Sequence, residues 1–196
     1  DNTMEFRDLK YQYRLHKKEI DNAIQSVLIN TNFIQGKQVS ELEKLLAEYV
    51  GVKHCITCAN GTDALQLALM TWNIGAGDAV FVPDFTFFSS GEVVPLVGAT
   101  PIFVDIDEDT YNINPQRLDQ AVQYVLEKTN LKPRVVIAVD LFGQPVDFKR
   151  IKEIAAKYNL LILEDGAQGF GGRIKTKKAC SFGDIATTSF LSLIHI

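Results

Sequence analysis

The chain has 196 residues, of which 46% are hydrophobic and 22% are charged, and its formal net charge at pH 7 is -4. This composition is typical of a globular chain with one sizeable core, and it excludes a broad basic surface for nucleic-acid backbones or anionic membranes. No apolar run in the sequence reaches the roughly 20 residues that span a bilayer, and the polar N-terminus lacks the layout of a signal peptide. We therefore expect a cytoplasmic protein that binds neither nucleic acid nor membranes.

The three cysteines, Cys55, Cys58 and Cys180, form an odd set, whereas a disulfide framework needs pairs. Cys55 and Cys58 have the C-x-x-C spacing of a redox pair or of half a zinc site, but no second pair or histidine set completes it. We therefore expect no metal site, and we interpret both thiols as core residues of a strand.

The two ends of the sequence depart from the rest. Asp1, Asn2 and Thr3 precede Met4, which we take as the natural start. The last six residues, 191–196, read Leu-Ser-Leu-Ile-His-Ile and resemble the translation of a transposon-derived adapter used in sequencing libraries. We expect the natural frame to end at Phe190, and a source nucleotide sequence without the adapter would refute this. A short apolar terminal strand is the alternative.

Two amphipathic helices are predicted first along the chain. Between Tyr13 and Asn30, apolar residues recur at near-helical spacing with charges between them. Gly36 then breaks the chain, and Val39–Tyr49 places three leucines on one face of a second helix.

From His54 onward, short apolar runs alternate with helical segments. The predicted strands are Cys55–Ala59, Ala79–Val82, Pro101–Ile106, Val135–Leu141, Leu160–Leu163 and Ile185–Phe190, and the predicted helices are Thr62–Leu69, Ser90–Val97, Pro115–Leu126 and Phe148–Tyr158. This alternation indicates a three-layer α/β/α fold with a mainly parallel sheet. Such sheets bind ligands beyond the carboxyl ends of their strands, so the residues that follow each strand are the candidates for a site.

The segment Asn60-Gly61-Thr62-Asp63 connects the first predicted strand to a helix. Gly61 allows a close approach of the backbone to a ligand, and a helix N-terminus presents unpaired N–H groups and a positive dipole end. A phosphate group fits such a turn. The alternative is an ordinary helix cap, because Asn, Thr and Asp all serve that role without a ligand.

An aromatic run, Phe85-Thr86-Phe87-Phe88, follows the strand that ends near Pro83. One ring at this edge is placed to stack on a flat heteroaromatic ligand, while we expect the others to fill the core.

Carboxylates and an amide follow the predicted strand Leu160–Leu163, in the run Glu164-Asp165-Gly166-Ala167-Gln168. A carboxylate there keeps a pyridine nitrogen protonated, and the protonated ring withdraws electrons from a neighbouring carbanion. Asp165 is the candidate for this role, and Gln168 for a bond to a ring hydroxyl. Metal binding, ribose binding and helix capping are alternative roles of an acid at this edge.

The last predicted strand, Ile185–Phe190, alternates apolar residues with hydroxyls and follows Ser181-Phe182-Gly183-Asp184. Ser189 at its end is placed to donate to the same phosphate as Gly61 and Thr62. Hydroxyls on an exposed strand face are the alternative.

In this order, the segments resemble the DegT/DnrJ/EryC1/StrS sugar aminotransferases, a family of aspartate-aminotransferase-like enzymes that use pyridoxal 5'-phosphate (PLP). The resemblance extends from Phe6 to Phe190. Its most specific stretches are Cys58–Leu65, Gly98–Asp107, Glu164–Gln168 and Ser181–Asp184.

The resemblance implies seven cofactor-binding residues, which are Gly61, Thr62, Asp63, Phe87, Asp165, Gln168 and Ser189. The first three and Ser189 correspond to residues that hold the cofactor phosphate. Phe87 corresponds to the ring that stacks on the pyridine, Asp165 to the partner of the pyridinium nitrogen and Gln168 to the partner of the ring hydroxyl. Family members usually have alanine where this chain has Gly166, a departure that we expect to matter little chemically.

The family's Schiff-base lysine stands five residues after the serine that corresponds to Ser189, and Ile194 occupies that position here. An alkyl side chain can neither bind the cofactor covalently nor move a proton. The three lysines at 175, 177 and 178 lie in a predicted surface hairpin and are poor replacements. We therefore expect no catalytic residue and no activity in the chain as given.

The resemblance also implies a domain plan and an activity for the intact enzyme. Residues 4–190 would form an incomplete PLP-binding large domain, 191–196 a non-native tail, and the C-terminal small domain would be missing. An amino donor such as glutamate would supply nitrogen to a nucleotide-linked keto sugar, for surface polysaccharide or related sugar biosynthesis, in a homodimer. The stretch Phe6–Lys10 and the overall sequence are closest to members that act on 3-keto sugars of the UDP-linked uronic-acid type.

Two alternative functions remain open at the level of sequence. A PLP-dependent nucleotide-sugar dehydratase of the same family has histidine in place of the lysine, and His195 stands one residue away from that position. A non-catalytic protein that binds the cofactor or the nucleotide sugar would require a natural terminus at Ile196.

Overall fold

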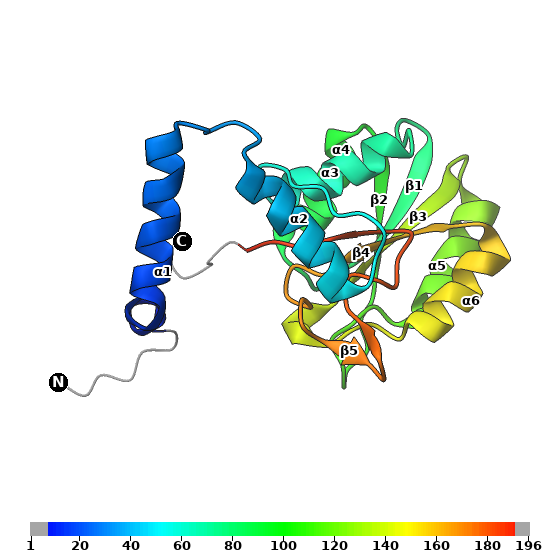
Figure 1. The fold of residues 1–196 in the computed structure, drawn as a ribbon. Helices are drawn as coiled ribbons and strands as arrows, with labels where there is room; N and C mark the ends of the chain where they lie inside the picture. Colours follow the sequence, from blue (N-terminus) through cyan, green and yellow to red (C-terminus); the bar gives the residue numbers. More distant parts are fainter. Residues whose placement is uncertain (1–7, 191–196) are drawn as a thin grey trace.

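The computed structural model of the chain describes residues 8–190 (Figure 1). The elements in chain order are α1 (Leu9–Asn30), α2 (Lys37–Val50), α3 (Gly61–Thr71), β1 (Asp78–Pro83), α4 (Phe88–Leu96), β2 (Thr100–Val104), α5 (Pro115–Lys128), β3 (Lys132–Val139), the 3-10 turn η1 (Leu141–Gly143), α6 (Phe148–Tyr158), β4 (Leu161–Asp165), β5 (Arg173–Ile174), β6 (Lys177–Lys178) and β7 (Ile185–Thr187). Met4, Ile194 and His195, on which several expectations depend, lie outside the described residues.

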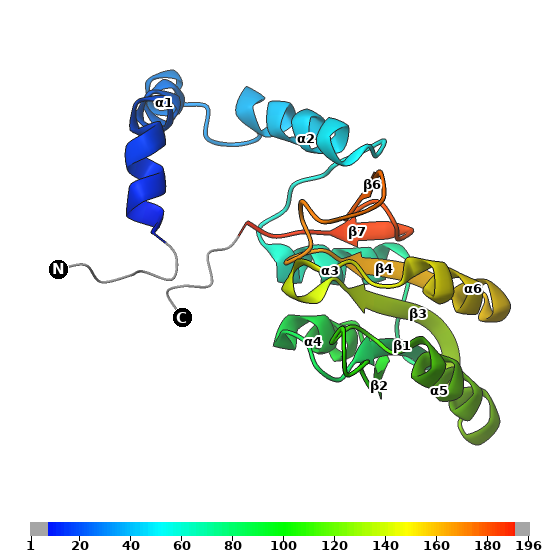
Figure 2. The ribbon, with the colours of Figure 1, turned by 90° about the horizontal axis from the view of Figure 1, so that it is seen from below.

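Five strands form one sheet in the order β2-β1-β3-β4-β7, and every neighbouring pair is parallel. Helices α3 and α4 pack on one face of this sheet, and α5 and α6 pack on the other (Figure 2). The predicted three-layer α/β/α fold with a parallel sheet is therefore confirmed.

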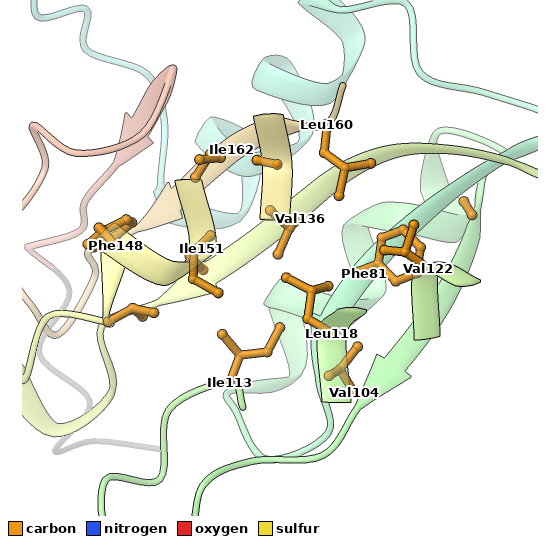
Figure 3. Close-up of a cluster of buried hydrophobic side chains, with 14 of the residues drawn as sticks. Phe81, Val104, Ile113, Leu118, Val122, Val136, Phe148, Ile151, Leu160 and Ile162 are labelled. Atoms are coloured by element: carbon orange, nitrogen blue, oxygen red, sulfur yellow. The ribbon is translucent and has the colours of Figure 1, made fainter. Parts of the chain in front are cut away.

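The central strands are buried on both faces because their side chains alternate between two cores. In β1, Ala79 and Phe81 belong to the core under α5 and α6, which Figure 3 shows around Leu118 and Ile151. Val80 and Val82 belong instead to the core under α3 and α4. This double burial explains why the strands read as continuous apolar runs.

Helix α1 lies apart from the sheet in both ribbon views, and none of its residues is buried (Figures 1 and 2). Its apolar residues Leu15, Ile24 and Leu28 are all more than half exposed. Among the helices of residues 8–190, none combines the length and the apolar character needed to cross a bilayer.

The prediction of a first strand at Cys55–Ala59 is wrong, because this segment is irregular chain and pairs with no described strand. Thr57 instead donates its backbone N–H and its hydroxyl to Glu43 Oε1 on α2, at 2.8 and 2.9 Å. The Glu43 side chain thus accepts a backbone hydrogen bond that a neighbouring strand would otherwise accept. Cys58 is exposed and Cys55 half-buried, so the interpretation of both as core thiols is also wrong.

The last predicted strand is shorter than expected, because β7 ends at Thr187. Thr188 and Ser189 continue beyond it as irregular chain, and Thr187 is buried rather than on an exposed face. The predicted hairpin that carries the three lysines is confirmed as the antiparallel pair β5 and β6.

Candidate functional site

The turn at residues 60–63 begins α3 at the carboxyl edge of the sheet, and its side-chain cap is Asn60. Asn60 Oδ1 accepts the N–H of Asp63 at 2.9 Å, and Asn60 Nδ2 donates to Asp63 Oδ2 at 3.0 Å. The ordinary cap is therefore present, and it uses the N–H of Asp63. Within residues 8–190, no acceptor bonds the N–H groups of Gly61 and Thr62. These two donors are the part of the turn that an anion can use.

Gly61 and Ser189 lie against each other although they are far apart in the sequence. A Cβ atom built on Gly61 would lie 3.0 Å from Ser189 Cβ and 3.4 Å from Ser189 Oγ. Packing of α3 against β7 produces this approach. The structure thus brings together two of the residues expected to hold one phosphate.

Asp165 is the last residue of β4 and is only 4% exposed. Ser90 Oγ donates to its Oδ2 at 2.8 Å, and the Ala167 N–H donates to its Oδ1 at 3.2 Å. Burial raises the pKa of the Asp165 carboxyl, and these two hydrogen bonds oppose the rise. Each oxygen keeps a lone pair for one further donor, as a pyridinium N–H requires.

Sequence reasoning missed Ser90 and its neighbour Thr86, whose hydroxyl lies 3.0 Å from Ser90 Oγ. The sequence places Ser90 at the start of a predicted helix and indicates no chemical role for it. A signal was present, because two adjacent serines, Ser89 and Ser90, open a mostly apolar helix that packs on the sheet. Ser89 Oγ is also 2.8 Å from Thr62 Oγ1, which connects α4 to the turn that begins α3.

Gln168 is exposed, and its Oε1 accepts the backbone N–H of Phe142 at 2.7 Å. This bond fixes the carbonyl end of the amide and identifies Nε2 as the end that can donate to a ligand oxygen. The anchoring N–H belongs to a residue in left-handed backbone conformation, with φ of 56°.

Phe87 precedes α4 and is half exposed, which suits a ring that stacks on a flat ligand. The expectation that its neighbours fill the core is wrong, because Phe85 is 48% and Phe88 73% exposed. The Phe85 ring instead lies 5.8 Å from Tyr111 and 6.4 Å from Phe142, measured between centroids. The apolar cores are already filled from β1 and the helices, so the rings remain at the sheet edge.

Gly166 is required by its surroundings in this chain. A Cβ atom at this position would lie 2.4 Å from Cys180 Sγ and 3.2 Å from the Thr187 carbonyl oxygen. The alanine that is usual in the family would therefore clash in this chain, because Cys180 fills the space that its methyl group would occupy.

The seven predicted residues thus lie along the carboxyl edge of β1, β4 and β7 and at the start of α3. A separate hollow of about 420 Å³ lies between α2 and residues 52–55 and is lined by none of them. None of its polar lining residues is buried, so the sheet edge is the better candidate for a site.

Comparisons with known proteins identify the family of the chain. The profile of the DegT/DnrJ/EryC1/StrS aminotransferase family matches residues 14–195. The UDP-2-acetamido-2-deoxy-3-oxo-D-glucuronate aminotransferase of Pseudomonas aeruginosa is 46% identical over 187 residues, which are 95% of this chain and 50% of that protein. The dTDP-3-amino-3,6-dideoxy-alpha-D-galactopyranose transaminase of Aneurinibacillus thermoaerophilus is 39% identical, over 94% of this chain and 49% of that protein.

Solved structures give the same result. A DegT DnrJ EryC1 StrS aminotransferase from Brucella abortus superimposes with a TM-score of 0.94 at 46% identity, over 96% of this chain and 50% of that one. A Streptococcus pneumoniae protein described as a sugar aminotransferase and solved in its PLP form gives 0.77 at 28% identity, over 86% and 46%. The chain therefore spans about half the length of the relatives that it matches. It belongs to the DegT/DnrJ/EryC1/StrS aminotransferase family.

Proposed function

We propose that residues 4–190 are the cofactor-binding large domain of a PLP-dependent enzyme that transfers an amino group to a nucleotide-linked keto sugar. The observation that carries this proposal is Asp165, a buried carboxylate at the carboxyl edge of the sheet, held by Ser90 and Ala167 with lone pairs remaining. Adjacent serines of α4 connect it with the turn that begins α3, since Ser90 bonds Asp165 and Ser89 bonds Thr62, and this supports one ligand with a basic ring nitrogen and a phosphate.

The residues present fit this cofactor. Gly61 and Thr62 would bind the phosphate through their N–H groups, with the hydroxyl of Ser189 beside them, while Asp63 remains bonded to its cap. Phe87 would stack on the ring, and Gln168 Nε2 would donate to the ring hydroxyl. When bound, the cofactor supplies an electron sink for the carbon that gains or loses nitrogen. Asp165 would hold the proton on the pyridine nitrogen that makes this sink effective.

The named relatives and the resemblance at the N-terminus support a proposal for the substrate class. The Pseudomonas aeruginosa relative is an aminotransferase of a 3-oxo-glucuronate sugar on UDP. We propose a UDP-linked 3-keto uronic-acid sugar as the acceptor and glutamate as the amino donor, in surface polysaccharide synthesis in the cytoplasm. The exposed apolar residues of α1 support assembly as a homodimer.

The chain as given would bind this cofactor without turnover, because Ile194 stands where the family has its lysine. We propose that 191–196 are not native and that a C-terminal small domain completes the natural protein.

The experiment that tests the proposal is a fluorescence titration of the chain with pyridoxamine 5'-phosphate, which needs no lysine to bind. Asp165→Asn should weaken binding roughly tenfold or more, because a hydrogen bond to a charged group contributes about 1.5–3 kcal/mol. The exposed Glu127→Gln near the C-terminal end of α5, which leads to the amino end of β3, removes the same charge at the opposite edge of the sheet and should leave the affinity unchanged. Equal affinities of the wild-type chain and Asp165→Asn would contradict the proposal.

A further inference from the structure

Two acids that carry no role in the proposed cofactor site, Asp140 and Glu164, are fully buried at the carboxyl ends of β3 and β4. Asp140 follows β3, and Glu164 is the penultimate residue of β4. Two charged carboxylates at adjacent buried positions would be strongly destabilising, so this acid pair requires a compensating proton or cation.

Glu164 acts as an acceptor of backbone hydrogen bonds. The N–H groups of Cys180, Phe182 and Gly183 donate to its carboxylate, and between them they use both oxygens. Glu164 thereby fixes residues 180–183, the segment that leads into β7. All three bonds need lone pairs on the oxygens of Glu164. Of the two acids, Glu164 is therefore the one that accepts hydrogen bonds.

Asp140 has a different environment. Its Oδ1 accepts the Val146 N–H at 3.0 Å, whereas its Oδ2 is buried and has no partner among donors in the described residues. Ala138 stands opposite Glu164 in the register of β3 and β4, so Asp140, two residues further on, lies on the same face of the sheet as Glu164. The charge of Glu164 and a hydrogen bond with its side chain both act on Asp140. Two ionised carboxylates cannot form a hydrogen bond, so this contact requires a proton, and Asp140 Oδ2 is the oxygen available to carry it.

We propose that Asp140 is a positioning residue that stays protonated at neutral pH and donates from Oδ2 to Glu164, so that the acid pair holds residues 180–183 in place. The other titratable groups facing the pair are Asp165 from β4 and the thiol of Cys180. Neither supplies a positive charge. No ion pair within residues 8–190 reaches Asp140 or Glu164.

The electrostatics of the site agree with this assignment. Burial, followed by the charge of Glu164, raises the pKa of Asp140 to about 8. Burial likewise raises the pKa of the Cys180 thiol to about 12, so this group stays neutral beside the pair.

The consequence for the cofactor site rests on the proposed function. Residues 180–183 lead through β7 to Ser189, which lies against Gly61. Asp140 also donates its backbone N–H to the carbonyl of Asp165 at 3.0 Å. The acid pair therefore holds two backbone segments that lead to the proposed site, residues 180–183 and the end of β4.

The test compares the stability of the wild-type chain with that of Asp140→Asn, whose amide donates to Glu164 without taking up a proton. Between about pH 4 and about pH 8, the folded wild-type chain holds one proton that the unfolded chain releases, so stability is lost as the pH rises. The ratio of the wild-type unfolding constant to that of Asp140→Asn should therefore rise about tenfold per pH unit in this window and level off above it.

Urea unfolding at intervals from about pH 5 to about pH 9 measures this ratio. Asp109→Asn, an exposed acid, is the matched control and should give a ratio that is almost independent of pH. A constant ratio for Asp140→Asn would overturn the proposal.

A second measurement covers the case in which Asp140→Asn does not fold. In the wild-type chain labelled with ¹³C at aspartate carboxyl carbons, one signal of the folded state should titrate near pH 8. Titration of every aspartate below about pH 5 would overturn the proposal. Neither measurement involves the cofactor, so failure of this inference is distinguishable from failure of the proposed function.

Discussion

Ser90 donates its hydroxyl hydrogen to Asp165 Oδ2 across 2.8 Å, and this direction determines the direction of the next bond. An ionised carboxylate only accepts, and a serine hydroxyl has one hydrogen to donate. Thr86, at 3.0 Å from Ser90 Oγ, must therefore donate to Ser90. Two hydroxyls from the start of α4 thus form a chain that ends on the carboxylate proposed to hold the pyridine nitrogen.

We predict that Ser90→Ala weakens the binding of pyridoxamine 5'-phosphate and reduces stability. The variant leaves a buried carboxylate oxygen without its donor, which costs about 1–3 kcal/mol. The pKa of Asp165 should rise further, because the bond from Ser90 opposes the effect of burial. Titration of the ligand at several pH values measures the affinity, and urea unfolding measures the stability.

Ser90→Thr is the control for this prediction, since it keeps the hydroxyl and adds only a methyl group. It should restore most of the affinity lost in the alanine variant. If both variants bind as weakly as each other, packing rather than the hydrogen bond explains the role of Ser90.

A second prediction concerns the close approach of Gly61 to Ser189. In Gly61→Ala, the new methyl group would meet Ser189 Cβ at 3.0 Å and displace it. We expect affinity for pyridoxamine 5'-phosphate to fall roughly tenfold, about 1.4 kcal/mol. Stability should change by less than about 1 kcal/mol, because alanine is the better helix former.

Gly75→Ala is the matched control, since its Cβ atom would meet nothing closer than the Val97 carbonyl oxygen at 3.6 Å. Its affinity should equal that of the wild-type chain. Unchanged affinity in Gly61→Ala would show that this turn does not bind the phosphate.

A third prediction concerns the contact between Gly166 and Cys180. Gly166→Ala should destabilise the chain by about 1–3 kcal/mol, because the methyl group overlaps with the sulfur of Cys180. Most of this loss should disappear in the Cys180→Ala background, where the space is vacant. Thermal or urea unfolding of the four chains measures the coupling. An equal cost of Gly166→Ala in both backgrounds would exclude the proposed steric cause.

Much of the fold was predictable because the signals are local. Periodic apolar spacing identified the helices, and doubly buried strands such as β1 and β3 read as continuous apolar runs. The order of strands and helices was sufficient to indicate a parallel sheet and a site at its carboxyl edge. The positions of Asp165 and Ser189 at that edge follow from the same rule, whereas Gly61 lies there because α3 packs against β7.

What could not be predicted depends on contacts between distant segments. Cys55–Ala59 has the composition of a strand, but Glu43 on α2 bonds its backbone instead. The role of Ser90 depends on Asp165, which is 75 residues away in the sequence. The need for glycine at 166 depends on Cys180, a residue on another segment. Contacts of this kind between distant residues can be recognised only in the three-dimensional structure.

The measurement that tests the cofactor site most directly is a titration of the ¹⁵N-labelled chain with pyridoxamine 5'-phosphate, followed by NMR. Saturable shifts should appear at the N–H groups of Gly61 and Thr62 and at Ala167, which donates to Asp165. Absence of saturation, or shifts confined to the hollow between α2 and residues 52–55, would contradict the site proposed at the carboxyl edge of the sheet.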